Sequence, residues 1–241
     1  MKETKTYGDY MKTIGLIGGM SWESSAEYYK IINETVKKRL GGLHSATLIM
    51  YSVDFEDIEK LQHAGEWDRA TEFMVDAARK VERGGADFVL ICTNTMHKMA
   101  DEVQQALNIP LLHIADATAA EIKAHNMKHV GLLGTRFTME EDFYKRRLQE
   151  YHGLTTIVPE EDERTIVHDI IYDELCCGEI RESSREKYKT IIENLIKRGA
   201  EGIILGCTEI PLLVSQRDSP VPVFDTTRIH AEAAVTLALT D

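Results

Sequence analysis

The second half of the chain repeats the first half in four blocks, and this repeat limits the possible folds more than any other feature. Residues 14–19 (IGLIGG) match residues 130–135 (VGLLGT), which begin 116 positions later. The other blocks keep the same order at similar offsets; they pair residues 28–29 with 143–144, residues 85–93 with 199–207, and residues 109–116 with 221–225. Four blocks in one order are hard to produce by chance, so the sequence predicts two similar lobes.

Strands and helices are expected to alternate within each lobe. Short apolar runs predict strands at residues 12–17, 46–51, 88–91, 111–114, 129–133, 155–158, 202–205 and 221–224. Between these runs, apolar residues recur every three or four positions, which is typical of amphipathic helices. Strict alternation predicts parallel sheets covered by helices on both faces. The expected fold is α/β, with two pseudo-symmetric Rossmann-like lobes that each contain a parallel four-stranded sheet.

Local signals predict where several helices begin. Ser/Thr-x-x-Glu sequences have the spacing of a capping box, and they predict one helix start near Ser24 and others at Thr138 and Ser183. An acidic run at residues 160–163 predicts an exposed helix start. A final helix is expected from Thr226.

The repeat also predicts the boundaries of the lobes. Residues 11–115 form the first expected lobe together with residues 224–241, because the last helix is expected to cross back to it. Residues 116–223 form the second lobe. Residues 1–10 (MKETKTYGDY) are polar, and they are expected to be an N-terminal extension. Open parallel sheets bind ligands beyond the carboxyl ends of their strands, so a cleft shared by the lobes is the expected active site.

The composition excludes several classes of partner. With 28 basic and 40 acidic residues, the formal net charge is −12, and no basic tract is available to bind nucleic acid. No run approaches the roughly 20 apolar residues of a membrane span, and the N-terminus lacks the apolar core of a signal peptide. The four cysteines form no CxxC pair, and the nine histidines form no HxH or HExxH motif, so no zinc site is expected. A cytoplasmic protein with reduced thiols fits these features best.

Two matched blocks end in polar residues where a strand is expected to pass into a helix. Alignment of residues 85–93 with 199–207 places Cys207 opposite Thr93 and sets Cys92 one position earlier. A thiol in such a place lies near free backbone N–H groups and a helix N-terminus, which stabilise a thiolate. The alternative is a buried cysteine that packs as a small hydrophobe. The polar neighbours of Cys207 favour a catalytic thiol.

Three motifs in these regions resemble those of a known family. They are residues 18–24 (GGMSWES), residues 93–97 (TNTMH) and residues 206–209 (GCTE). Over about residues 11–239, the chain resembles the aspartate/glutamate racemase superfamily of cofactor-independent racemases, and it is most similar to broad-specificity amino-acid racemases related to aspartate racemase. The resemblance implies an isomerase that acts on an amino acid, uses neither pyridoxal phosphate nor a metal ion, and forms a homodimer.

The resemblance also implies roles for individual residues. Racemisation needs an acid/base group on each face of the α-carbon and donors that hold the α-carboxylate. Cys207 is expected to abstract the proton from the L enantiomer. The other implied site residues are Asn94, Thr95, Thr208, Met20, Ser52, His97 and Glu209. Of these, the first three are expected to hold the α-carboxylate or the α-amino group. His97 is expected to orient its loop, and Glu209 either to tune the thiol or to cap a helix.

The first motif departs from the pattern of the family. The family's block begins Cys-Asn-Thr, whereas here Thr93 occupies the first position and Cys92 precedes it. A slip of one residue along a strand turns a side chain to the opposite face, so Cys92 is expected to face away from the substrate. Thr93 then serves the second face, and L substrates are expected to be accepted faster than D substrates. If the strand ends irregularly, Cys92 reaches the site instead.

A second departure concerns specificity. Cys176 stands where aspartate racemases typically carry a lysine for the distal carboxylate, which favours neutral or broad specificity. Asp54 either lines the pocket or caps a helix.

Three other functions stay open, namely a decarboxylase or a cis–trans isomerase of the same superfamily that uses one cysteine, and a non-catalytic amino-acid-binding module. Unusually fast reaction of Cys207 with thiol reagents would favour an enzyme over a binding module.

Overall fold

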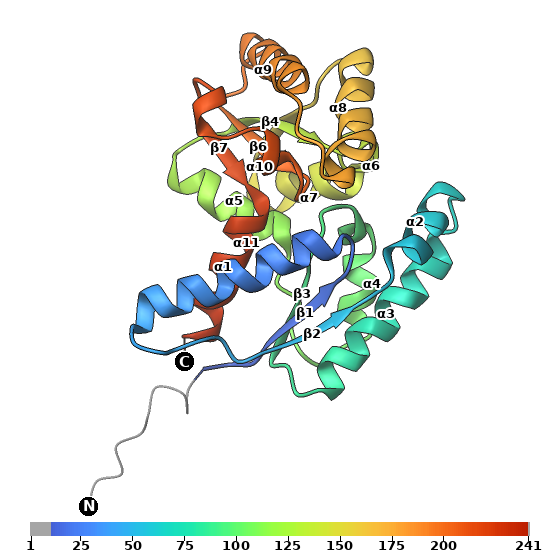
Figure 1. Cartoon of the computed structure of the whole chain (residues 1–241), viewed down its shortest axis with the longest axis vertical. Coiled ribbons are helices and arrows are strands. Elements are labelled where there is room, and N and C mark those ends of the chain that lie inside the picture. Colours follow the sequence, from blue (N-terminus) through green and yellow to red (C-terminus); the bar gives the residue numbers. More distant parts are fainter. Residues whose placement is uncertain (1–10, 241) are drawn as a thin grey trace, which may run out of the picture. The chain divides into compact units, whose positions relative to one another are not determined.

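The computed structural model describes residues 11–240, and the extension expected at residues 1–10 lies outside this range. The chain forms two compact units (Figure 1). Unit 1 comprises the chain up to Cys92, Met99–Leu112 and the chain from His230, whereas unit 2 comprises Thr93–Lys98 and His113–Ile229. Residues 93–98, which the repeat assigns to the first lobe, therefore pack with unit 2. Among the described helices, none is long and apolar enough to cross a membrane.

Unit 1 contains a parallel sheet of three strands in the order β2-β1-β3. The strands are β1 (Ile14–Gly18), β2 (Leu48–Ser52) and β3 (Phe88–Ile91). The prediction of a fourth strand at residues 111–114 is wrong, because Leu111 makes only an isolated bridge with Val89. The chain has no room for a longer strand there, since His113 already caps the helix that begins at Ile114.

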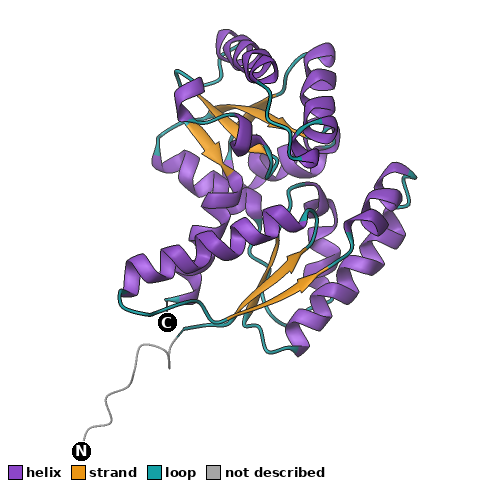
Figure 2. Cartoon of the chain, viewed as in Figure 1, coloured by secondary structure: helices purple, strands orange, loops and turns teal. Residues whose placement is uncertain are grey.

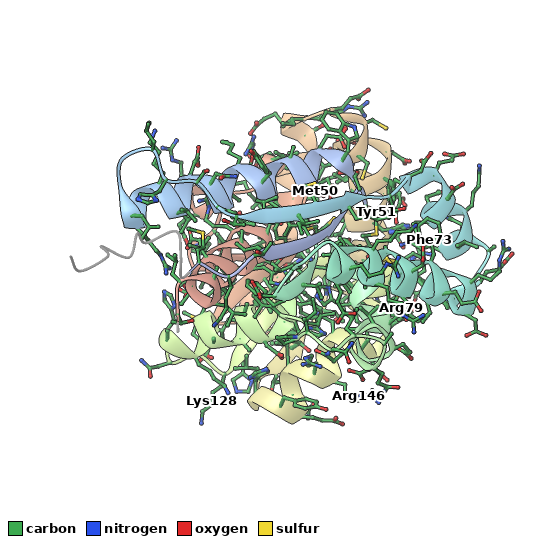
Figure 3. The ribbon with its side chains drawn as sticks, turned by 90° about the horizontal axis from the view of Figure 1, so that it is seen from below. Met50, Tyr51, Phe73, Arg79, Lys128 and Arg146 are labelled. Atoms are coloured by element: carbon green, nitrogen blue, oxygen red, sulfur yellow. The ribbon has the colours of Figure 1, made fainter. Side chains whose placement is uncertain are left out.

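Helices cover both faces of this sheet (Figures 1 and 2). They are α1 (Trp22–Leu40), α2 (Phe55–His63), α3 (Trp67–Arg83), α4 (Ala100–Gln105) and the later turns of α11 (Thr226–Ala238), with the short 3-10 helix η2 (Thr95–Met99) just before α4. Apolar side chains of α1 and α11 pack against β1 and β3 on one face. On the other face α3 comes so close that a Cβ on Gly15 would lie 2.4 Å from Val81 Cγ1. Figure 3 shows Tyr51 on β2 with Phe73 on α3, and Lys80 of α3 donates to Tyr51 Oη at 2.8 Å.

Two interpretations of helix starts in unit 1 are decided by the structure. The prediction of a helix start near Ser24 is confirmed, but the cap is Ser21, whose Oγ accepts from the Ser24 N–H. Serines at 21, 24 and 25 can each occupy a cap position, so the sequence pattern alone did not fix the register. Asp54 caps α2, and its Oδ1 accepts from the Glu56 N–H at 3.1 Å.

Unit 2 contains the predicted parallel sheet of four strands, and their order is β5-β4-β6-β7. The strands are β4 (His129–Gly134), β5 (Thr155–Ile157), β6 (Gly202–Gly206) and β7 (Val223–Asp225). The helices are α5 (Ile114–Ala124), α6 (Arg136–Glu140), α7 (Asp142–His152), α8 (Glu161–Asp173), η3 (Leu175–Cys177), α9 (Glu182–Lys197), α10 (Ile210–Leu213), η4 (Gln216–Asp218) and the first turn of α11. Helices α8 and α9 pack on one face and α5 and α7 on the other, which confirms the α/β class.

The predicted helix starts in unit 2 agree only in part with the structure. Glu160 caps α8, and its N–H donates to Glu163 Oε2, so the acidic run does mark a helix start. The start expected at Thr138 is wrong, because Thr135 caps α6 three residues earlier and a new helix, α7, begins at Asp142. The start expected at Ser183 falls one residue late.

A partly buried ion cluster joins α5 to α7. Arg147 donates to both oxygens of Asp116 at 2.7 Å, and His152 Nε2 lies 2.8 Å from Asp116 Oδ1. Burial acts to raise the pKa of Asp116, but the hydrogen bonds from Arg147 and His152 outweigh it and hold the pKa below its usual value. The cluster therefore stabilises the fold above about pH 4, and this contribution is lost as the pH falls through the lowered pKa.

We expect Asp116→Asn to reduce the free energy of unfolding at pH 7 by about 1–3 kcal/mol, because charge-assisted hydrogen bonds of Arg147 are lost. The difference from the wild type should shrink as the pH is lowered below 4. Urea denaturation at several pH values measures both effects. Asp142→Asn is the control, because its carboxylate is 85% exposed and lies 3.8 Å from Lys145. Equal losses in both variants would contradict a special role for the cluster.

Candidate active site

Cys207 directly follows β6, and its thiol is hydrogen-bonded to a carboxylate. The Sγ–H donates to Glu209 Oε2 at 3.0 Å, and Thr208 Oγ1 donates to the same oxygen at 2.7 Å. The Cys207 and Glu209 side chains are buried, with exposed fractions of 8% and 7%. Because Glu209 already accepts the thiol proton in a hydrogen bond, it is placed to receive that proton outright.

The surroundings of Cys207 raise the pKa of its thiol well above the ordinary value. Burial is the largest cause, followed by the negative charge of Glu209, and Cys176 adds to it. The backbone N–H of Glu209, at the start of the four-residue α10, does lower this pKa as expected, but burial and the carboxylate outweigh it. The resting thiol is therefore neutral at pH 7. Slow reaction with thiol reagents is expected for the protein at rest, so that test does not separate an enzyme from a binding module.

Asn94 connects the first motif to the end of β6. Its Nδ2 donates to Thr226 Oγ1 at 3.1 Å, and Thr226 Oγ1 donates to the Leu205 carbonyl at 2.9 Å. The single hydroxyl proton of Thr226 points at the carbonyl, so the hydroxyl must accept from Asn94, and this fixes the orientation of the amide. The structure thus holds Asn94 of the first motif next to the strand that leads to Cys207.

The amide orientation leaves an acceptor without a partner. Asn94 Oδ1 is buried and finds no donor within the described part of the chain. Leaving a buried acceptor unsatisfied costs about 1–3 kcal/mol, so Asn94 Oδ1 is a candidate contact for a ligand that carries a donor. Thr227 Oγ1 is a second buried oxygen for which residues 11–240 provide no partner.

Three threonine hydroxyls form a chain beside this network. Thr95 Oγ1 lies 3.1 Å from Thr135 Oγ1, which lies 3.3 Å from Thr138 Oγ1. Thr135 directly follows β4, so this row of hydroxyls lies at the carboxyl end of an interior strand of the sheet. Such hydroxyls are neutral donors suited to a carboxylate. Across residues 11–240, no three His, Cys, Asp or Glu side chains are arranged to hold a metal ion.

His97 is buried and bonded to backbone groups on both sides of its ring. Nδ1 lies 2.7 Å from the Thr93 carbonyl oxygen, and Nε2 accepts from the Ile114 N–H at 3.2 Å. Its ring also packs against that of His113, with 4.4 Å between the ring centroids. These contacts fit the expected role of orienting the loop, because both ring nitrogens form hydrogen bonds with backbone groups.

Unit 1 holds the remaining predicted site residues. Cys92 is fully buried and shares an apolar cluster with Phe88 and Leu90 on the face covered by α1. Burial raises the pKa of the Cys92 thiol far above its ordinary value. Met20 is 4% exposed and Ser52 is exposed. Their contact with substrate stays a prediction.

The family of the chain follows from comparison with known proteins. The model of the Asp/Glu/Hydantoin racemase family matches residues 17–234, which is most of the chain. The chain belongs to this family.

Relatives with the same architecture accompany this match. The crystal structure of a Yersinia pestis protein assigned as an Asp/Glu racemase is 54% identical, with a TM-score of 0.90, and the match covers 95% of this chain and 100% of that one. An aspartate racemase homologue from Pyrococcus horikoshii is 37% identical, with a TM-score of 0.83 and coverage of 95% and 99%. The broad-specificity amino-acid racemase RacX of Bacillus subtilis is 26% identical over 231 residues, or 94% and 98% of the two chains. The protein is thus an amino-acid racemase by family, an isomerase.

Cys176 of this racemase-family protein lies in the same core cluster as Cys207. It belongs to η3 and packs, partly buried, against the apolar residues around the catalytic candidate. A thiol at this position offers no fixed positive charge to a substrate.

The sequence pattern gave no functional role to Thr135, Thr226 or Thr227. Thr135 directly follows β4, and the other two follow β7. A systematic search of the residues after each strand of a parallel sheet would have found them, because ligands bind at that edge.

Proposed function

We propose that the protein interconverts the L and D enantiomers of an amino acid with Cys207 on one face of the α-carbon and Thr93 on the other. The observation that carries this proposal is the hydrogen bond from the Cys207 thiol to Glu209, which pairs a neutral thiol with its own proton acceptor. The assignment of Thr93–Lys98 to the same compact unit as Cys207 supports it. No pyridoxal phosphate is invoked.

The proposed proton path balances with the groups present. Glu209 takes the thiol proton, and the resulting Cys207 thiolate removes the α-proton of the L enantiomer. The electron pair stays on the substrate, delocalised into its carboxylate. The Thr93 hydroxyl then gives a proton to the opposite face, and its oxygen regains one from Glu209 through water. The positive α-ammonium group of the substrate favours the thiolate, because an opposite charge nearby stabilises the charged form of the thiol.

Two further features suit the α-substituents of an amino acid. Asn94 Oδ1 is an acceptor that lacks a donor, so it suits the α-ammonium group. The neighbouring hydroxyls of Thr95 and Thr135 are donors, so they suit the carboxylate. Fixed donors at the carboxylate stabilise the negative charge that develops as the α-proton leaves.

The Thr93 hydroxyl makes the two faces unequal, but thermodynamics limits how this can appear. Enantiomers have equal free energies, so kcat/KM must be the same in both directions. The expected preference for L substrates is therefore confined to kcat and to proton exchange. In D₂O, Cys207 can return deuterium to the face it deprotonated, so the L enantiomer should exchange its α-proton faster than it inverts.

The substrate panel is the first test of this proposal. The purified protein is incubated with the L and D forms of aspartate, glutamate and neutral amino acids, without added cofactor, and products are resolved by chiral chromatography. We expect inversion of at least one pair, with neutral amino acids among the substrates because Cys176 offers no cation. Formation of a decarboxylated product instead would favour the single-cysteine alternative, which gains support from the burial of Cys92 in an apolar core. If no amino acid is turned over, the remaining hypothesis is the non-catalytic amino-acid-binding module.

A further inference from the structure

The hydrogen bonds of His97 fix which of its ring nitrogens carries the proton. The Thr93 carbonyl can only accept, so Nδ1 must donate to it at 2.7 Å. The Ile114 N–H can only donate, so Nε2 must accept from it at 3.2 Å. The ring is therefore the neutral Nδ1–H tautomer, with both nitrogens engaged by backbone.

The two residues that are hydrogen-bonded to His97, Thr93 and Ile114, lie next to points where the chain passes from unit 1 to unit 2. Cys92 lies in the core of unit 1, and Thr93 is the first residue assigned to unit 2. Lys98, next to His97, is the last residue of that short segment, and Ile114 follows the next crossing, at Leu112–His113. Through one buried ring, the Thr93 carbonyl is thus tied to the N-terminus of α5.

We propose that His97 is a positioning residue for racemisation, which holds the backbone of Thr93 in unit 2 so that the Thr93 hydroxyl keeps its place relative to Cys207. This inference rests on the proposed function. Thr93 follows a residue that belongs to the other unit, so its position in unit 2 depends on contacts such as this one. His97 acts through Thr93, because its ring bonds to the Thr93 carbonyl and to the Ile114 N–H.

Two substitutions separate the two hydrogen bonds of the ring. His97→Asn can keep a donor near the position of Nδ1, and with it the bond to Thr93. His97→Gln keeps a polar group near Nε2 but loses the donor to Thr93. We expect His97→Gln to lower the rate of inversion about 10–100-fold, while L-face exchange of the α-proton in D₂O, which needs Cys207 and Glu209 but not Thr93, stays near the wild-type rate. His97→Asn should keep the ratio of inversion to exchange within about threefold of the wild type.

His113→Asn is the matched control, because it alters a buried histidine in the same cluster whose Nδ1 caps α5 by accepting from the Ala115 N–H. It should leave the ratio of inversion to exchange unchanged, whatever its effect on thermal stability. Equal loss of exchange and inversion in His97→Gln, or no loss of either, would overturn the proposal. Failure of the proposed function would appear differently, as a wild type that neither exchanges nor inverts any amino acid.

A measurement on the wild type keeps the proposal testable if His97→Gln does not fold. Nitrogen-15 NMR of histidine-labelled protein reports the tautomer of each ring. We expect His97 to show a protonated Nδ1 and an unprotonated Nε2 at neutral pH. The opposite tautomer, or an imidazolium, would contradict the bond to Thr93 and with it the positioning role.

Discussion

Cys207→Ser is expected to reduce racemisation by about 10³-fold, since acid/base groups in the transition state typically contribute 10²–10⁴-fold. The serine hydroxyl is a much weaker acid than the thiol, so Glu209 can no longer take its proton readily. The substitution conserves size, and a hydroxyl can still donate to Glu209 Oε2, so the fold should be retained. The inversion rate by chiral chromatography and the melting temperature by circular dichroism measure the two effects.

Cys177→Ser is the matched control for this loss. Cys177 is an exposed thiol that bonds weakly to the Tyr172 carbonyl at 3.6 Å, and its replacement should leave the rate unchanged. A Cys207→Ser variant within tenfold of the wild type would show that another group removes the proton. Equal losses in both variants would point to a general effect of thiol removal.

Glu209→Gln is expected to have two opposite effects. The loss of the carboxylate removes a negative charge that raises the pKa of Cys207, so the thiol should react faster with iodoacetamide. Racemisation should nevertheless fall by about 100-fold, because the acceptor of the thiol proton is gone. The two rates are measured on the same preparation, by mass spectrometry of the alkylated peptide and by chiral chromatography.

Glu209→Asp distinguishes the effect of the negative charge from the effect of the side-chain length. It keeps the negative charge but shortens the side chain, so alkylation should stay slow while racemisation falls. If Glu209→Gln racemises as fast as the wild type, Glu209 takes no part in proton transfer. The other interpretation, that its side chain caps a helix, is wrong, because Glu209 occupies the N-cap position of α10 without a side-chain capping bond. A decrease in alkylation would show that its charge does not raise the pKa of the thiol.

Strand periodicity was enough to predict the orientation of Cys92. Phe88, Leu90 and Cys92 alternate along one strand and pack in one cluster, on the face covered by α1. Cys207 instead shares a cluster with Ile203 and Leu205, on the face covered by α8 and α9. The two cysteines therefore face opposite sides of their sheets, as the one-residue offset in the repeat predicts.

The electrostatic state of Cys207 could not be predicted in the same way. The pattern indicated a helix after the strand, but it gave neither the length of that helix nor the direction of the Glu209 side chain. Burial is the largest cause of the raised pKa, and the carboxylate at 3.0 Å adds to it, while a short helix attracts a thiolate only weakly.

The packing of residues 93–98 with unit 2 was also beyond the sequence pattern. The repeat assigns this segment to the lobe whose strand precedes it. Its place depends instead on bonds to residues far away in the chain, from Asn94 to Thr226 and from Thr95 to Thr135. Neither threonine stood out by composition or spacing, and only the folded structure brings them next to the motif.

The central claim is that the Cys207 thiol removes the α-proton of an L-amino acid, and deuterium exchange tests it most directly. Wild type and Cys207→Ser are each incubated in D₂O with the L and D forms of the best substrate, and proton NMR follows the α-proton while chiral chromatography follows configuration. We expect the wild type to deuterate the L enantiomer faster than it inverts it, and Cys207→Ser to do neither at a comparable rate. Undiminished deuteration by Cys207→Ser, or no deuteration of any amino acid by the wild type, would contradict this account.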